Sequence, residues 1–202
     1  MRDIPLLSTQ LGIWLADQVA DRKNAYVIAH AVEMPGAIDA GRLARAIRTV
    51  MAEADTVTAT FHQTGDGIVQ TLRTACGTAD IPEPDRMDLR GAPGPMAAAR
   101  AVMEADLACG LPADGPGPLF RHVLFDVSGE EGPRWVWYQR YLHIMLDGFS
   151  FTAVTRRVAE VYQALRCHEP IGLSPFVSVA AVVEEQRDYA ASPAIARDRA
   201  FW

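Results

Sequence analysis

The sequence lacks most features that would direct it to nucleic acid or a membrane. Lys23 is the only lysine, the formal net charge is −6 at pH 7, and no basic run offers a surface for phosphate backbones or anionic lipids. No apolar run is long enough to cross a bilayer, and the first residues lack the apolar core of a signal peptide. We therefore expect neither nucleic acid nor membrane as a partner.

Cysteine is scarce as well, with three residues that form neither a CxxC pair nor the spacing of a zinc site. An odd number of separated thiols is typical of a cytoplasmic protein with free cysteines. Most histidines are equally scattered. These isolated residues are Cys76, Cys109, Cys167, His30, His62, His122 and His168. We therefore expect no metal site and a cytoplasmic location.

Two common catalytic signatures are missing too. Ser8 has no GxSxG context, so it fits a helix N-cap better than a nucleophile. No glycine-rich loop is present that could hold a phosphate group. The sequence therefore indicates neither a nucleophile elbow nor a nucleotide-binding loop.

What the chain does have is an alternation of two apolar periodicities. Half of its 202 residues are hydrophobic, which is enough for the core of one domain. Helical spacing alternates with β-branched and aromatic runs, and this predicts an α/β fold. Helices are expected over about residues 8–19, 39–55, 96–107, 150–165 and 176–189, and again from 192. Strands are expected over 26–34, 56–63, 68–72, 119–127 and 134–143, with a short strand near 81 and turns at 21–24, 65–67 and 115–118.

One corner of this predicted fold gathers residues able to do chemistry. His143 ends a strand, Asp147 follows four residues later, and Gly148 lies in the turn before the next helix. A histidine with a pKa near 6.5 can exchange a proton at cellular pH. An aspartate can hold a turn through backbone amides, and a glycine lets a substrate approach the backbone. An isolated pattern of this kind equally fits a structural histidine and a helix cap, so the residues alone leave both interpretations open.

Strand alternation assigns the neighbouring positions. His143 shares a face with Tyr141, whereas Leu142 and Arg140 point to the opposite face. Leu142 is therefore expected to pack and not to react. In the following helix the apolar spacing places Arg157 on the solvent side.

Residues 138–151 resemble the HHxxxDG region of nonribosomal peptide synthetase condensation domains. Residues 7–14 resemble the opening motif of that family, residues 55–61 occupy the place of its LRTxF motif, and residues 200–202 resemble the stretch that ends its first lobe. The resemblance spans essentially the whole chain. It implies an α/β sandwich of the chloramphenicol-acetyltransferase type. Residues 1–202 would be the N-terminal lobe of a two-lobed, V-shaped domain, with the second lobe absent from this chain.

The resemblance also implies a reaction, namely the joining of a donor acyl thioester to an acceptor amine in the biosynthesis of peptide natural products such as antibiotics. No cofactor would bind directly, because both substrates would arrive on the phosphopantetheine arms of peptidyl or aryl carrier proteins. The opening motif begins within a few residues of Met1. We therefore expect the donor on a separate carrier protein. An isolated lobe would be an inactive part of the acyltransferase and would self-associate through its exposed inter-lobe face.

The same resemblance implies a role for each residue of the corner. His143 would be the second, functional histidine of the motif. It would act either as general base on the acceptor nitrogen or as a group that positions and stabilises the tetrahedral intermediate. Asp147 would hold the loop, Gly148 would keep its backbone near the thioester, and Ser150 belongs to the same motif.

The chain departs from the family pattern at two positions. Leu142 stands in place of the first motif histidine, and its predicted packing role makes that loss tolerable. Thr58 stands in place of an arginine that pairs with the motif aspartate, so Asp147 lacks its expected partner. Thr58 could hydrogen-bond to Asp147, or Arg140 could supply the charge, because an unpaired buried carboxylate is costly.

These departures leave two alternatives open beside the amide-forming domain. The first is a non-catalytic relative that binds carrier proteins or recruits a tailoring enzyme, which the two substitutions favour. The second is a free-standing acyltransferase that uses a CoA or carrier thioester with a small-molecule acceptor. The donor, the acceptor and the product are not specified by the sequence.

Overall fold

A computed structural model describes residues 1–21, 25–65, 67–73, 76–111, 113 and 118–202. Its strands are β1 (Arg2–Pro5), β2 (Val27–Pro35), β3 (Thr60–Thr64), β4 (Gly67–Leu72), β5 (Asp85–Asp88), β6 (Phe120–Asp126) and β7 (Arg134–Leu142). Its α-helices are α1 (Ser8–Val19), α2 (Ala40–Glu53), α3 (Pro95–Ala108), α4 (Gly148–Cys167), α5 (Val179–Ala191) and α6 (Ala194–Phe201). Two short 3-10 helices are η1 (Asp55–Thr58) and η2 (Thr78–Asp80).

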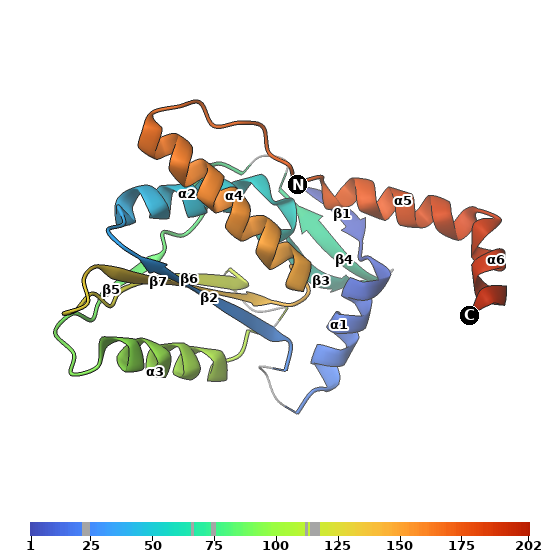
Figure 1. The fold of residues 1–202 in the computed structure, drawn as a ribbon. Coiled ribbons are helices and arrows are strands. Elements are labelled where there is room, and N and C mark those ends of the chain that lie inside the picture. Colours follow the sequence, from blue (N-terminus) through green and yellow to red (C-terminus); the bar gives the residue numbers. More distant parts are fainter. Residues whose placement is uncertain (22–24, 66, 74–75, 112, 114–117) are drawn as a thin grey trace.

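A four-stranded sheet in the order β2-β7-β6-β5 forms the centre of the molecule. Helices α2 and α4 cover one face of this sheet and α3 covers the other (Figure 1). Strand β7 pairs with β2 on one side and β6 on the other, both antiparallel, while β5 runs parallel to β6. A smaller sheet, β1-β4-β3, stands beside it. The predicted α/β sandwich is confirmed.

The main core lies between the central sheet and the pair α2 and α4. Helix α2 begins after Asp39, whose side chain accepts a hydrogen bond from the Arg42 backbone N–H, as expected for an N-cap. The apolar stripe of α2 is buried against α4, and its members are Leu43, Ala46, Ile47, Val50 and Met51. From α4 the core receives Val154, Val158 and Val161. Both apolar stripes that the sequence indicates are therefore core.

The prediction that Arg157 faces water is wrong. Arg157 is 4% exposed, and its guanidinium donates two hydrogen bonds of 2.9 Å to the Glu53 carboxylate at the end of α2. Its side chain also donates to the Gly172 carbonyl. A buried arginine at a helix contact needs such a carboxylate, and the periodicity of α4 alone does not show Glu53.

A second core lies between the sheet and α3, built from Ala99, Val123, Phe125, Val127, Val136 and Tyr138. Its polar centre is Asp106 of α3, which is 7% exposed. The Asp106 carboxylate accepts from Arg121 and from the Tyr138 hydroxyl, and Arg140 Nε lies 3.0 Å from Asp106 Oδ2. Because helices cover both faces, β7 is buried from Val136 to Leu142.

Several predicted boundaries are corrected by the structure. Residues 55–58 form the 3-10 helix η1 and only then the strand β3, although the run is rich in β-branched residues. The strand expected near residue 81 lies at Asp85–Asp88, after η2. Leu7, and not Ser8, is the N-cap of α1, because Gln10 bonds the Leu7 N–H with its side chain. The turns expected at 21–24, 65–67 and 115–118 fall partly outside the described residues.

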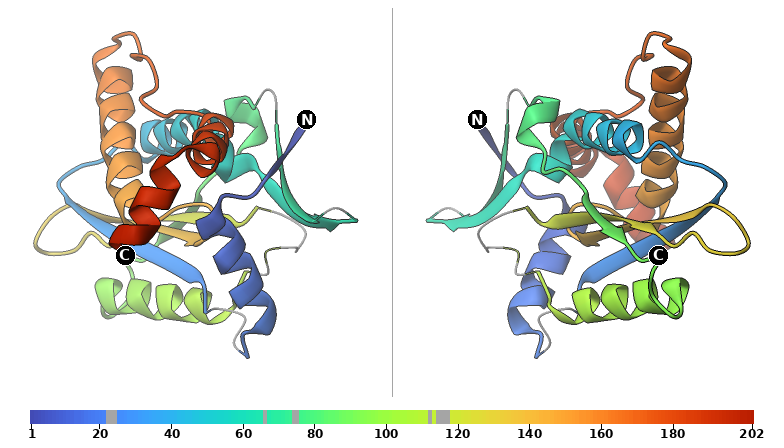
Figure 2. Two further views of the ribbon diagram at one scale, coloured as in Figure 1. Left: turned by 90° about the vertical axis from the view of Figure 1, so that its right-hand side faces the viewer. Right: turned by 90° about the vertical axis from the view of Figure 1, so that its left-hand side faces the viewer.

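Helices α5 and α6 project from one side of the molecule and carry the chain away from the central sheet (Figures 1 and 2). Helix α5 begins at Val179, three residues later than expected, because Ser178 caps it by accepting from the Ala180 N–H. Leu173, Phe201 and Trp202 are 97%, 81% and 97% exposed. This part of the chain therefore presents large apolar groups to solvent.

Candidate active site

The main chain fixes the position of His143, the first residue after β7. The His143 N–H donates to the Tyr26 carbonyl over 2.7 Å, and the Leu142 N–H donates to the Leu119 carbonyl over 2.9 Å. The Met145 N–H closes the turn by donating to the Leu142 carbonyl. The histidine is thus held at the junction between the central strand and α4, as the sequence predicts.

The His143 ring is half-buried and lines a cavity of about 340 Å³. Its walls come from α1, η1, the turn after β7 and the start of α4, with Gln10, Thr56 and Asp147 among them. Nδ1 of His143 is buried and has no hydrogen-bond partner among the described residues. This arrangement leaves Nε2 as the ring nitrogen that can meet a substrate.

Gln10 ties α1 to this turn, a role that the sequence did not reveal. It is 5% exposed, and its Nε2 donates to the Ile144 carbonyl and to Gln70 Oε1, each over 3.2 Å. Gln70 Nε2 returns a hydrogen bond of 2.8 Å to Gln10 Oε1. The signal was present in the opening motif, which contains Gln10, but its partner Gln70 lies on β4 and carries no motif. The small sheet therefore supports the turn that carries His143.

Asp147 is the N-cap of α4. Its Oδ1 accepts from the Ser150 backbone N–H over 2.8 Å and from the Ser150 hydroxyl over 2.7 Å. These bonds to Ser150 hold the pKa of the Asp147 carboxyl below its usual value. Gly148 begins the helix, and a Cβ placed on it would meet nothing within 4 Å. Ser150 thus cooperates with Asp147, while the space beside Gly148 is open in this chain.

Neither suggested substitute for the missing arginine reaches Asp147. The Thr58 hydroxyl donates to the Asp55 carbonyl over 3.3 Å, and Arg140 pairs with Asp106 on the α3 side of the sheet. Strand alternation explains the second result, because Arg140 points away from the face that carries His143. Asp147 is exposed and capped, so it avoids the cost expected for an unpaired buried carboxylate.

Leu142 is fully buried in the main core. It therefore has the packing role that the sequence predicts.

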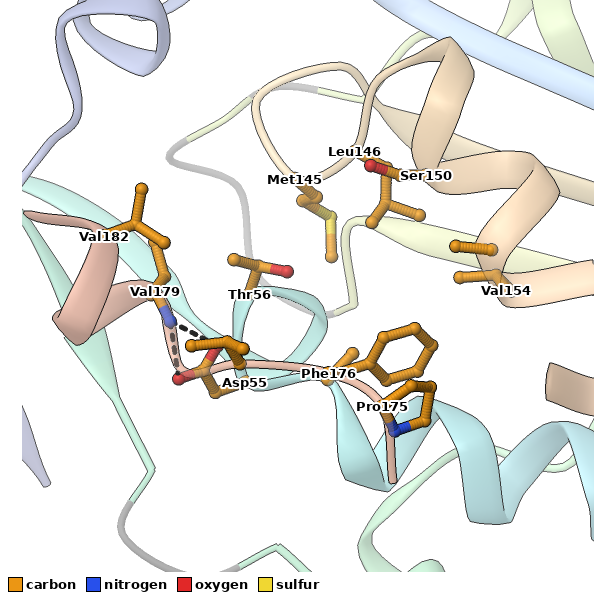
Figure 3. Close-up of a pocket in the computed structure, with 13 residues that line it drawn as sticks. Asp55, Thr56, Met145, Leu146, Ser150, Val154, Pro175, Phe176, Val179 and Val182 are labelled. Carbon is orange, nitrogen blue, oxygen red and sulfur yellow. Dashed lines mark hydrogen bonds between the residues drawn. The ribbon is translucent and has the colours of Figure 1, made fainter. Parts of the chain in front are cut away.

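A second cavity of about 310 Å³ adjoins the first. It lies between η1, the turn after β7, the start of α4 and the segment that leads into α5 (Figure 3). The two cavities share Thr56, Met145, Leu146, Ser150 and Val179 as lining residues. Asp55 closes one side by capping α5, since its carboxylate accepts from the Ser178 hydroxyl over 2.6 Å and from the Val179 N–H over 3.1 Å.

Metal sites, membrane-spanning helices and disulfides are the other features that could bear on function in the described part of the chain. No group of three or more His, Cys, Asp or Glu side chains is placed to hold a metal ion there. Within the same residues, no helix combines the length and the apolar character that a membrane span requires. Cys76, Cys109 and Cys167 are free thiols, and burial raises the pKa of Cys76.

Comparison with known proteins finds large synthases that contain a region similar to this chain. The chain is 42% identical over 199 residues to enterobactin synthase component F of Shigella flexneri, covering 98% of this chain and 15% of that protein. It is 37% identical over 203 residues to the isonitrile lipopeptide synthase of Streptomyces coeruleorubidus, covering 98% of this chain and 13% of that protein. The chain thus spans less than one sixth of the length of these two relatives.

Solved structures agree with the sequence relatives. The starter condensation domain of rhizomide synthetase RzmA is 33% identical, with a TM-score of 0.86, and the match covers 100% of this chain and 47% of that one. The first condensation domain of the CDA synthetase is 30% identical, with a TM-score of 0.83, covering 100% and 49%. The family model named Condensation domain matches residues 1–202. The family predicted from the motifs is confirmed, and the chain belongs to the condensation domains of nonribosomal peptide synthetases.

Proposed function

We propose that residues 1–202 are the N-terminal lobe of a two-lobed condensation domain that forms an amide bond. The donor is an acyl thioester and the acceptor is the amine of an aminoacyl thioester, both on phosphopantetheine arms of peptidyl or aryl carrier proteins in the cytoplasm. The observation that carries this proposal is the placement of His143 in a cavity at the junction of β7 and α4. The match to about half of each solved condensation domain supports a second lobe that completes the site.

The reaction requires attack of the acceptor nitrogen on the donor carbonyl carbon. A C–N bond forms, the C–S bond then breaks, and the proton lost by the amine ends on the released thiol. The tetrahedral intermediate carries negative charge on the former carbonyl oxygen. A preorganised hydrogen-bond donor at that oxygen is therefore the main contribution that a protein group can make.

The surroundings of His143 favour that donor role. Nδ1 of His143 is buried without a partner among the described residues, so Nε2 is the ring nitrogen that can meet a substrate. We infer that Nε2 carries the proton in the reacting complex and that Nε2–H donates to the developing oxyanion. Asp147 keeps the first turn of α4 in place beside it through Ser150.

A solved relative supports the substrate classes. The rhizomide starter condensation domain, in a doubly substituted form, was determined in complex with C8-CoA and Leu-SNAC. For this chain we infer an acyl donor and an aminoacyl acceptor of the same kind, presented by carrier proteins that need not be fused to it. No cofactor is required beyond the phosphopantetheine arms.

The test is amide formation by the complete domain that contains this chain. A donor-loaded and an acceptor-loaded carrier protein are mixed with the domain, and the product on the acceptor carrier is measured by mass spectrometry. We expect product that depends on both carriers. Binding of loaded carriers without product would favour the non-catalytic relative, and transfer from acyl-CoA to a free small molecule without any carrier would favour the free-standing acyltransferase.

A further inference from the structure

The 310 Å³ cavity beside the His143 site has an apolar wall. Its side chains include Leu146 from the turn after β7, Ala153 and Val154 from α4, and Phe176 and Val182 from the other side (Figure 3). A volume of this size suits a small ligand group, and apolar lining with few polar groups is typical of a binding pocket. The shared lining residues place this cavity directly beside the one that His143 lines.

One polar side chain of the lining is free to bind. The Asp55 carboxylate is occupied by Ser178 and Val179, and the Ser150 hydroxyl donates to Asp147. The Thr56 hydroxyl makes no hydrogen bond to any described residue, and Figure 3 shows it directed toward the middle of the ring of lining residues. A half-buried hydroxyl in an apolar pocket gains a hydrogen bond when a ligand supplies the partner.

The wall opposite α4 is fixed in place. Asp55 caps α5 from η1, so the segment that carries Phe176 cannot move away without breaking the bonds to Ser178 and Val179. Thr56 follows Asp55 directly, on the same 3-10 helix. The bonds of Asp55 therefore tie the start of α5 to the 3-10 helix that carries Thr56, and such support is what a pocket needs to select a substrate by size.

We propose that this cavity receives the apolar group attached to a reacting thioester carbonyl, and that Thr56 hydrogen-bonds to a polar substituent on that group. The proposal rests on the proposed amide-forming function. The group is an aliphatic chain or a ring bearing a hydroxyl or another hydrogen-bonding atom. It belongs either to the donor acyl or to the acceptor side chain, which are the two groups joined to thioester carbonyls in this reaction.

The first experiment replaces the hydroxyl at constant shape. In the complete domain, Thr56→Val is compared with Thr60→Val, an exposed threonine outside both cavities. Donor carriers bear unsubstituted acyl groups from acetyl to octanoyl or their ω-hydroxy counterparts, and acceptor carriers bear leucine or threonine. We expect Thr56→Val to lower kcat/KM about tenfold more for hydroxylated groups of one series than for the matching unsubstituted groups. Thr60→Val should leave both unchanged.

The second experiment fills the pocket. Ala153→Leu places a larger side chain in the cavity at a helix position that tolerates leucine, and Ala159→Leu makes the same change on the exposed side of α4. We expect Ala153→Leu, and not its control, to shift the preferred group to a shorter one. The series that shifts, donor or acceptor, identifies which group occupies the pocket.

An unchanged length and hydroxyl profile in both cavity variants, with wild-type amide formation intact, would refute the pocket and leave the proposed function standing. Absence of amide formation by the wild type with every donor and acceptor would refute the proposed function itself. Circular dichroism of Ala153→Leu confirms that its fold is retained. If the fold of Ala153→Leu is lost, the hydroxyl profile of Thr56→Val alone tests the pocket.

Discussion

Replacement of Asp147 separates two explanations of this residue. The family pattern pairs it with an arginine, whereas the structure shows it exposed and bonded to the Ser150 N–H and hydroxyl within its own helix turn. Asparagine caps helices about as well as aspartate, whereas alanine does not. We therefore expect Asp147→Asn to be nearly neutral and Asp147→Ala to reduce the free energy of unfolding by about 1 kcal/mol.

The expected loss of unfolding free energy in Asp147→Ala is small, because the Asp147 carboxylate is solvated and makes no ion pair among the described residues. In a chain of this size it corresponds to a fall in Tm of about 2–4 °C. A buried ion pair would give a different result, since removal of one partner costs about 3–5 kcal/mol and asparagine would not replace the charge. Asp39→Ala removes the corresponding cap of α2 and is the matched control for stability.

The pH dependence gives a second readout of the same cap. The pKa of Asp147 is lowered in the folded state, so its charged form adds stability above the ordinary aspartate pKa of 3.8. That stability is lost as the pH falls through the folded pKa. The difference between wild type and Asp147→Ala should thus be full at pH 7 and shrink in acid. Urea unfolding measures both effects, and a loss above about 3 kcal/mol for Asp147→Asn would refute the capping account.

Three further predictions concern the rest of the chain. Arg157→Met should lower the free energy of unfolding in urea by about 3–5 kcal/mol, because it leaves Glu53 unpaired. Adding Glu53→Gln to the same chain should recover part of that loss. A loss below about 1 kcal/mol for Arg157→Met would contradict the buried pair. Burial lowers the pKa of His122 to about 3, whereas the unfolded chain binds a proton at this histidine once the pH falls below about 6.5. The free energy of unfolding should therefore drop by up to about 1.4 kcal/mol per pH unit in this range. The same pH dependence of the unfolding free energy in His122→Gln would oppose this. The isolated 202-residue chain should self-associate through the exposed Leu173, Phe201 and Trp202, so light scattering should show oligomers that a triple serine variant reduces; a monomer at high concentration would count against it.

Local patterns in the sequence predict most of the elements. Asp39 before an apolar stripe, Pro95 before an alanine-rich run and the alternation in β6 and β7 all lead to the observed helices and strands. Thr56 and Thr58 mislead, because β-branched residues favour a strand while the chain must turn there from α2 into β3. The chain turns there because of its contacts with distant parts of the fold, and a short stretch of sequence does not contain that information.

At the candidate site, the sequence likewise predicts the residues that lie close together in the chain and misses those that meet from distant segments. His143, Asp147 and Gly148 are found from spacing, since they lie within one strand–turn–helix unit. Gln70, Glu53 and Asp106 are missed because each meets its partner from a distant part of the chain. Sequence reasoning expected Arg140 to be available for Asp147, although strand alternation already placed it on the other face.

The central claim is that His143 promotes amide formation at the end of β7. The most direct measurement compares wild type with His143→Ala in the complete domain, using loaded carriers, with His30→Ala as an exposed control on β2. Removal of one preorganised oxyanion donor lowers kcat by about 100- to 1000-fold, so we predict that loss for His143→Ala, with circular dichroism and carrier binding unchanged. Wild-type turnover by His143→Ala would contradict the account.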